Sequence, residues 1–157
     1  MKRTSAPTTL VISFATVFVL GVLPVAQADE HRGCSNATLN SSYGFVATGT
    51  LLALPAPFAG PFGEIGRQTF DGRGHTDGTG TLSANGNIVR VTVDGTYEVN
   101  KDCTGSMTLF ILPFGATATF DFVIDDDGTE IKVIATDPGA VETRVYREQF
   151  HNDRRGK

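Results

Sequence analysis

The chain has 157 residues, of which 40% are hydrophobic and 19% are charged, with a formal net charge of −4 and two cysteines. An acidic balance of this kind argues against nucleic acid as a partner, because phosphate binding requires a basic surface. The length is that of a single domain, and it is sufficient for a hydrophobic core without extra staples.

The first 28 residues have the pattern of a secretory signal peptide. A basic start is followed by a mostly apolar run over residues 10–23 and by a small-x-small cleavage site at Ala26-Gln27-Ala28. The apolar run of 14 residues is short for a membrane span, which takes about 20. We expect residues 29–157 to be exported as one domain, secreted or periplasmic, with no membrane span after cleavage. The alternative is an uncleaved anchor helix.

Two cysteines, Cys34 and Cys103, remain in the expected mature chain. In an exported protein the default for such a pair is a disulfide. Closing a loop of about 70 residues contributes roughly 4 kcal/mol on the chain-entropy estimate. A thiol nucleophile or a metal pair is the competing interpretation, but there is no C-x-x-C motif and no histidine beside either cysteine.

Residues Tyr43 to Leu54 are predicted to form the first strand, with two internal glycines marking a bulge or a bend. Residues Pro55 to Gly63 are predicted to be an apolar loop, since three prolines argue against a central strand. Phe58 and Phe62 in this loop either cover a barrel mouth, meet a partner or a membrane surface, or fold back onto the core.

Four Asp-Gly or Asn-Gly pairs mark the stretch from residue 69 to residue 99 as a run of antiparallel hairpins. Such pairs supply the positive φ angles of tight turns. They are Asp71-Gly72, Asp77-Gly78, Asn85-Gly86 and Asp94-Gly95. The strands expected in this part of the chain are Glu64–Asp71, His75–Leu82, Asn87–Val93 and Thr96–Val99.

The rest of the chain continues the same pattern, with apolar residues alternating most regularly from Ala116 to Ile124. The strands expected here are Ser106–Leu112, Ala116–Ile124, Glu130–Ala135 and Val141–Phe150. Eight or nine strands at spacings of about ten residues, without a helical stripe, indicate an all-β fold. We favour a single antiparallel up-and-down β-barrel of about eight strands over a sandwich, because closure removes exposed strand edges.

Several turn and disulfide motifs recur in an order that is similar to a group of uncharacterised exported bacterial proteins. They are Cys34–Leu39 with Tyr43-Gly44-Phe45, Phe70–Gly74, Thr96–Val99 with Asp102–Gly105, and Thr136–Gly139. The group resembles the allene oxide cyclase-like and dirigent-like barrels of the calycin class. The resemblance implies an eight-stranded barrel with a small, largely apolar lumen. No catalytic motif of those enzymes matches here residue by residue, so no catalytic residue is carried over.

Two other clusters were weighed for chemistry. Asp125-Asp126-Asp127 could bind calcium through oxygen, but the further ligands of a calcium loop are missing and a hairpin turn is the better interpretation. His75 and Asp77 could form an acid/base pair if they share a face, yet no nucleophile is implied beside them. The sequence therefore predicts no metal, no cofactor and no catalytic residue.

Four polar side chains are candidates for the barrel interior or its rim: Arg67, Tyr97, Arg144 and Tyr146. A buried arginine requires a partner. Glu64 could form an ion pair with Arg67, and Glu142 could form one with Arg144. Such groups either orient a ligand or join strands across the outer face, and the second interpretation is favoured. The candidate ligand-binding residues are Phe58, Phe62, Arg67, Tyr97, Phe120, Phe122 and Tyr146.

The leading functional hypothesis is a binding module for a small apolar ligand, because a barrel of about eight strands leaves room for either packed side chains or one small ligand. The alternatives are a cyclase- or isomerase-type enzyme and a surface interaction protein that uses the phenylalanine-rich loop 55–63. A ligand binder requires a void of roughly several hundred cubic ångströms. An enzyme requires at least two hydrogen-bonded titratable side chains that face this void.

Overall fold

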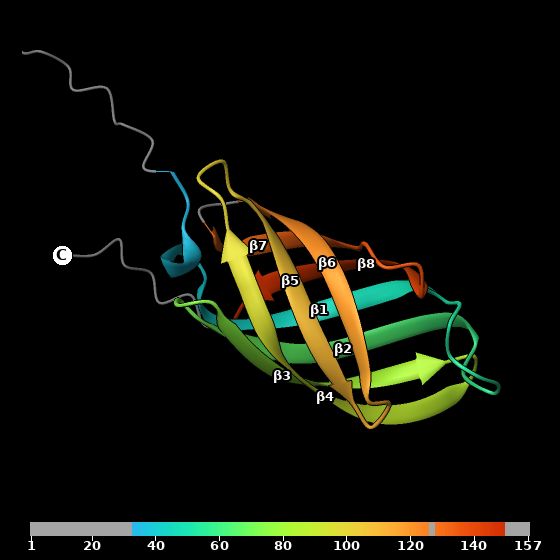
Figure 1. Ribbon diagram of the computed structural model, residues 1–157. Helices are drawn as coiled ribbons and strands as arrows, with labels where there is room; N and C mark the ends of the chain where they lie inside the picture. The colour runs from blue at the N-terminus through green and yellow to red at the C-terminus, as the bar shows by residue number, and fades with distance from the viewer. Residues whose placement is uncertain (1–32, 126–127, 150–157) are drawn as a thin grey trace, which may run out of the picture. The chain divides into compact units, whose positions relative to one another are not determined.

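The computed structural model describes residues 33–125 and 128–149, and these form a closed antiparallel β-barrel (Figure 1). Consecutive strands pair with each other, and the last strand returns to the first. The predicted all-β, up-and-down barrel is confirmed. The strands are β1 Asn40–Leu51, β2 Gly60–Asp71, β3 His75–Ala84, β4 Asn87–Val99, β5 Thr104–Leu112, β6 Ala116–Asp125, β7 Glu130–Ala135 and β8 Ala140–Glu148, and the 3₁₀ turn η1 Asn36–Thr38 precedes them.

Short hairpins connect the strands, and two of them use the predicted turn pairs. Asn85 and Gly86 have φ angles of 47° and 83°, the left-handed pair that a two-residue hairpin of type I′ requires. Gly72 has a φ of 76° in the turn between β2 and β3. Closure comes from β1 and β8, which pair from Tyr43 opposite Glu148 to Leu51 opposite Ala140.

The other two Asp-Gly pairs are not turns. Asp77-Gly78 lies inside β3, as in the expected strand His75–Leu82, whereas the turn expected at Asp94-Gly95 is wrong. β4 runs without a break from Asn87 to Val99, so Asp94-Gly95 lies inside one strand. Asp94 is paired with Asp77 of β3, and Gly78, which follows Asp77, also lies inside that strand. Gly95 is explained by packing, because a Cβ there would come within 2.9 Å of the Leu109 side chain of β5.

The predicted loop Pro55 to Gly63 is also shorter than expected. β1 ends at Leu51, and β2 begins at Gly60, so Pro61, Phe62 and Gly63 are strand residues. Phe62 is opposite Gly49 of β1 and is buried. A proline is tolerated near the start of a strand. The connection itself is therefore residues 52–59.

One end of the barrel, here called the base, is covered by η1 and the chain around it. The Tyr97 hydroxyl donates to the Leu39 carbonyl (2.9 Å), and the Tyr43 hydroxyl donates to the Gly128 carbonyl (2.6 Å). The predicted disulfide between Cys34 and Cys103 is present, with 4.9 Å between the Cα atoms. It fixes the segment before β1 to the turn between β4 and β5.

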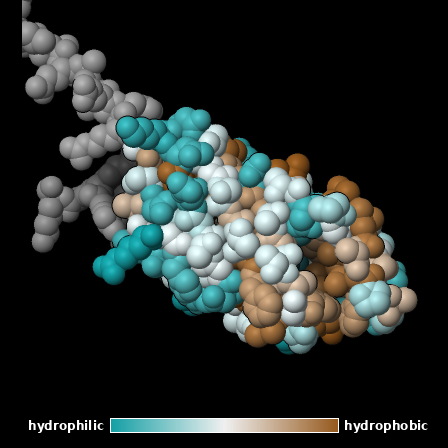
Figure 2. All heavy atoms as spheres, in the orientation of Figure 1, coloured by the Kyte–Doolittle hydropathy of each residue, from teal (hydrophilic) through white to brown (hydrophobic). Residues whose placement is uncertain are grey.

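The opposite end, here called the mouth, carries the β1–β2, β3–β4, β5–β6 and β7–β8 connections. Figures 1 and 2 show it at the right, where hydrophobic side chains gather, while hydrophilic ones predominate nearer the base. Within the described part of the chain, no helix has the length and apolar character needed to cross a membrane.

The predicted signal peptide lies outside the described residues. So do Asp126 and Asp127 of the predicted acidic turn, and Phe150, the predicted end of the last strand.

Candidate functional site

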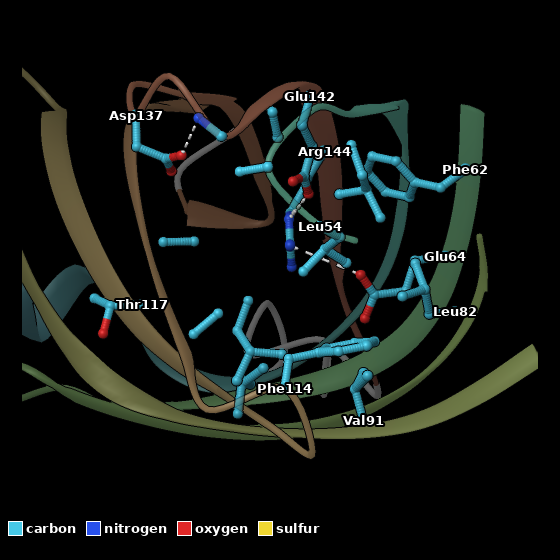
Figure 3. Close-up of a pocket in the computed structure, with 18 residues that line it drawn as sticks. Leu54, Phe62, Glu64, Leu82, Val91, Phe114, Thr117, Asp137, Glu142 and Arg144 are labelled. Carbon is cyan, nitrogen blue, oxygen red and sulfur yellow. Dashed lines mark hydrogen bonds and ion pairs between the residues drawn. The ribbon is translucent and has the colours of Figure 1, made fainter. Parts of the chain in front are cut away.

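A cavity of about 160 Å³ enters the barrel lumen from the mouth (Figure 3). Its lining comes from strand interiors and from the β1–β2, β5–β6 and β7–β8 connections. Most of the wall is apolar. Aromatic and aliphatic residues that contribute to it include Phe62, Leu82, Val91, Ile111 and Phe114.

Three charged side chains occupy one side of this cavity: Glu64, Glu142 and Arg144. All three are buried, at 7%, 6% and 4% exposure. The Arg144 guanidinium donates through Nε to Glu142, and its Nη2 lies 3.7 Å from Glu64 Oε2. Figure 3 shows Arg144 extending between the two carboxyl groups, so the cluster is held together by the one cation.

Aromatic rings support the guanidinium from β1 and β6. Its Cζ lies 4.7 Å from the ring centroid of Phe120 and 5.5 Å from that of Phe45. A desolvated cation over an aromatic face gains about 2 kcal/mol from the ring quadrupole. Arg144 is thereby held in one position by two carboxylates and two rings.

Strand alternation explains why these residues share the interior. Glu142 and Arg144 are two apart on β8, so both point inward. Glu64 points inward from β2, in step with the buried Phe62. Gly80 of β3 makes room for it, because a Cβ at Gly80 would lie 2.5 Å from the Glu64 carboxylate.

Burial changes the proton affinity of the cluster. It raises the pKa of Glu64 and of Glu142, and the nearby Arg144 offsets only part of that effect. Burial lowers the pKa of Arg144, but Tyr146, Glu142 and Glu64 together raise it above its ordinary value. Arg144 therefore stays charged, while the two carboxyl groups hold protons more tightly than carboxyls in water.

One donor of the cluster has no acceptor. Arg144 Nη1 is buried and makes no hydrogen bond with any described residue. Burial raises the pKa of the nearby Tyr146 phenol, and Arg144 lowers it in part. The Tyr146 hydroxyl itself donates to Gln68 Oε1 (2.9 Å). An unpartnered buried donor costs about 1–3 kcal/mol, so an acceptor delivered to Nη1 stabilises the site.

Deeper in the lumen, Gln68 forms a hydrogen-bonded network that is complete. Its Oε1 accepts from Tyr146, and its Nε2 donates to Thr76 Oγ1 (2.9 Å) and contacts Met107 Sδ (3.3 Å). The Thr76 hydroxyl in turn donates to the Thr69 carbonyl (2.8 Å). This network packs the lumen below the cavity and explains its limited depth.

The candidate ligand-binding residues fall in three places. Phe62 lines the cavity, and Phe58 packs against Phe114 at the mouth with 5.6 Å between ring centroids. Phe120 lies under Arg144, and Tyr146 belongs to the lumen network. The remaining candidates lie away from the cavity: buried Tyr97 and Phe122 towards the base, and exposed Arg67 on the outer face.

Two pairing hypotheses have different outcomes. Arg144 does pair with Glu142, but inside the barrel and not across its outer face. Arg67 does not pair with Glu64; its Nη2 donates to Ser42 Oγ at 3.3 Å.

The acid/base hypothesis for His75 also changes. His75 Nε2 lies 3.0 Å from Asp94 Oδ2 on the exposed surface, so its partner is not Asp77. Among the residues that the structure describes, no group of three or more His, Cys, Asp or Glu side chains could hold a metal ion.

No family model matches this chain, and no curated protein matches it either. Its function is therefore argued from the cavity. The sequence did contain a signal for Glu64, because period-two alternation from Phe62 to Phe70 places residue 64 on the inner face.

Proposed function

We propose that this protein is an extracytoplasmic binding module that holds one small, mainly apolar molecule in the cavity at the barrel mouth. The observation that carries the proposal is the composition of this cavity: a mostly apolar wall whose charged groups are the Glu64–Glu142–Arg144 cluster and, apart from it, Asp137. Small-molecule sites in proteins commonly combine these two features.

The cavity volume limits the ligand. Small-molecule pockets usually have about 300–1,000 Å³, and this cavity of about 160 Å³ is smaller than the void expected from the sequence. A cavity of about 150 Å³ is enough for a benzene-sized molecule. The ligand is therefore a single ring or a short chain.

The charged cluster sets the polar group of the ligand. One cation and two carboxyls sum to zero or to −1, depending on whether one carboxyl is protonated. Asp137 adds a further acidic side chain to the lining, so an anion gains no net attraction. A neutral acceptor such as a carbonyl oxygen adds no charge and matches the free Arg144 Nη1 donor. Because Nη1 is buried, the acceptor reaches it only when a neighbouring side chain moves. The preferred ligand is a small carbonyl compound with an apolar body.

Four ring compounds of nearly equal size test this preference: toluene, benzaldehyde, benzoate and benzylammonium. Benzaldehyde should bind most tightly, toluene more weakly, and the two ions weakest, in calorimetric titrations at pH 7. Native mass spectrometry of the exported protein for a co-purifying molecule gives a second test. Equal affinity for all four, or none for any, contradicts the proposal.

A proton-transfer enzyme of the isomerase type is a second candidate, favoured by one observation. Glu64 and Glu142 both face the cavity with raised pKa values, as catalytic acids and bases often do. In D₂O, a carboxylate that removes a proton next to the carbonyl of cyclohexanone and returns a deuteron leaves a deuterated ketone. Exchange that is faster with the protein than with its Glu64→Gln variant supports this candidate, and equal rates exclude it.

The exported location of the protein and its resemblance to a group of β-barrel proteins are further parts of this proposal. The disulfide and the predicted signal peptide support a secreted or periplasmic location. The mass of the protein recovered after export tests cleavage after Ala28. The resemblance to allene oxide cyclase-like and dirigent-like barrels is carried by turn and disulfide residues, so it supports the scaffold and assigns no chemistry.

A further inference from the structure

Large apolar side chains stand exposed around the barrel mouth. Exposed fractions are 58% for Leu52, 64% for Ile88, 48% for Leu112 and 66% for Val141. Ile88, Leu112 and Val141 lie at the ends of β4, β5 and β8. Leu52 is the first residue of the β1–β2 connection, so each of the four belongs to a different mouth connection. They therefore surround the cavity entrance, and we call them the collar.

The four mouth connections to which the collar residues belong carry no exposed charged side chain. Residues 52–59, 85–86, 113–115 and 136–139 include one ionisable residue, Asp137. Its carboxylate accepts from the backbone N–H groups of Gly139 (2.8 Å) in the same connection and of Thr119 (3.2 Å) in β6, and Asp137 also contributes to the cavity lining. The turns at the base, in contrast, carry charges of both signs, such as Arg73, Lys101 and Asp102.

Part of the backbone of the longest mouth connection is bonded within the protein. The N–H groups of Leu52 and Ala53 donate to the Gly139 carbonyl (2.9 and 3.1 Å). Pro57 has no N–H, and its carbonyl accepts from the Asn85 side-chain amide (3.2 Å). A segment that enters an apolar phase must satisfy its peptide groups internally, whereas one that faces water need not.

We propose that the collar docks the barrel, mouth first, on a neutral lipid surface. Apolar side chains without exposed charge, on a connection whose backbone is bonded in part within the protein, are what the interfacial edge of a lipid phase accepts. The lipid is neutral because the chain is acidic and an anionic surface would repel it. If the cavity binds an apolar molecule, as proposed above, docking gives this ligand a path between lipid and lumen that avoids water.

Lipid is favoured over a second copy of the chain by the shape of the surface. The collar residues come from all four mouth connections, at the end of the barrel where the cavity opens, and none of them lines the cavity. A fluid lipid surface can contact such an arrangement without a matching shape. Two identical collars facing each other would leave the cavity openings between them, and protein interfaces depend on close packing at their centre.

Flotation with phosphatidylcholine vesicles tests the docking. The wild-type protein recovered after export should float with the vesicles, and Ile88→Asp should reduce the bound fraction at least tenfold. Ile65→Asp is the matched control, because Ile65 is 65% exposed on the side of the barrel, in the middle of β2. Leu52→Asp repeats the test at another connection. All variants have the same N-terminal sequence, so any vesicle binding by that segment is equal in all of them and does not affect the comparison.

The outcomes separate this proposal from the one it extends. An equal loss for Ile65→Asp, or no flotation of the wild type, overturns the docking. A concentration-dependent dimer that Ile88→Asp abolishes overturns it too, in favour of self-association. Benzaldehyde binding measured without vesicles tests the cavity alone. Ile88→Asp should leave this binding unchanged, because Ile88 does not line the cavity. If the wild type floats but does not bind benzaldehyde, docking stands and the ligand proposal fails.

Discussion

Arg144 of β8 forms an ion pair with Glu64 of β2, with 3.7 Å between Nη2 and Oε2, although β1 lies between these two strands. The contact passes over the inner face of β1 and does not follow a strand pairing. Both residues are buried, so neither charge is shared with water. Buried pairs of this kind add little net stability but are costly to break, because the remaining charge is left without a partner.

Replacement of Arg144 by methionine should therefore destabilise the barrel strongly. It leaves two buried carboxyls without their cation, and we expect the free energy of unfolding at pH 7 to fall by about 3–5 kcal/mol. Urea denaturation measures the change. Arg147→Met is the control on the same strand, since Arg147 is exposed and its ion pair with Glu130 should contribute less than about 1 kcal/mol. Similar losses for both variants would contradict the buried cluster.

Stability should increase on mild acidification. Burial raises the pKa of Glu64 and of Glu142 above the ordinary carboxyl value of 4.5. The folded chain then binds these protons more tightly than the unfolded chain, so stability is lost as pH rises through the folded pKa values. The free energy of unfolding should grow from pH 7 towards pH 4.5, as followed by urea denaturation at each pH. Glu64→Gln should flatten this rise, and a fall over the same range would contradict it.

Further acidification should reverse the trend. Backbone hydrogen bonds, from Arg73 first, hold the pKa of Asp71 below 3.8, and hydrogen bonds from Thr104 do the same for Asp102. Such groups contribute stability that is present above their ordinary pKa and lost as pH falls through the lowered one. Stability should thus pass through a maximum between the two limbs. Asp71→Asn and Asp102→Asn together should weaken the acid limb and leave the limb above pH 4.5 unchanged.

The strand pattern was largely predictable, because barrel strands alternate with period two. The error at Asp94-Gly95 was avoidable. Val93 and Tyr97 are both buried, which a continuous strand allows. A two-residue turn at 94–95 would have paired residue 93 with Thr96 and placed Thr96 on the inner face in place of Tyr97. Whether a candidate turn keeps the apolar residues of both flanking segments on the inner face is therefore a better guide than the Asp-Gly pair itself.

The site was harder to predict because charged side chains are expected on the outer face of a barrel and not in its lumen. Alternation alone places Glu142 and Arg144 on one face of β8 and Glu64 beside Phe62 on β2. Nothing local shows that these two faces meet across the lumen. That meeting depends on closure by β1 and β8 and on the small residue Gly80, which are long-range features.

The disulfide should stabilise the base of the barrel. Cys34 and Cys103 are 69 residues apart in sequence, and the backbone N–H of Cys34 also donates to the Lys101 carbonyl (3.1 Å). On the chain-entropy estimate the bridge contributes roughly 4 kcal/mol. Cys34→Ser, made together with Cys103→Ser, should lower Tm under oxidising conditions and remove its dependence on reductant. A wild-type Tm that reductant does not change would show that the bridge does not form in solution.

Glycine at position 105 should be required by packing. A Cβ there would overlap the Phe122 ring and the Glu98 carbonyl oxygen, both fixed within the sheet. Overpacking of this kind costs about 1–3 kcal/mol, so we expect Gly105→Ala to lower the free energy of unfolding by that amount. Gly63→Ala is the control, because a Cβ at Gly63 has no neighbour within 4 Å. It should be neutral or stabilise by about 0.4–1 kcal/mol, since alanine restricts the unfolded chain. Equal effects in urea denaturation would show that the Phe122 ring moves aside, and that the interior near the base is more adaptable than the structure implies.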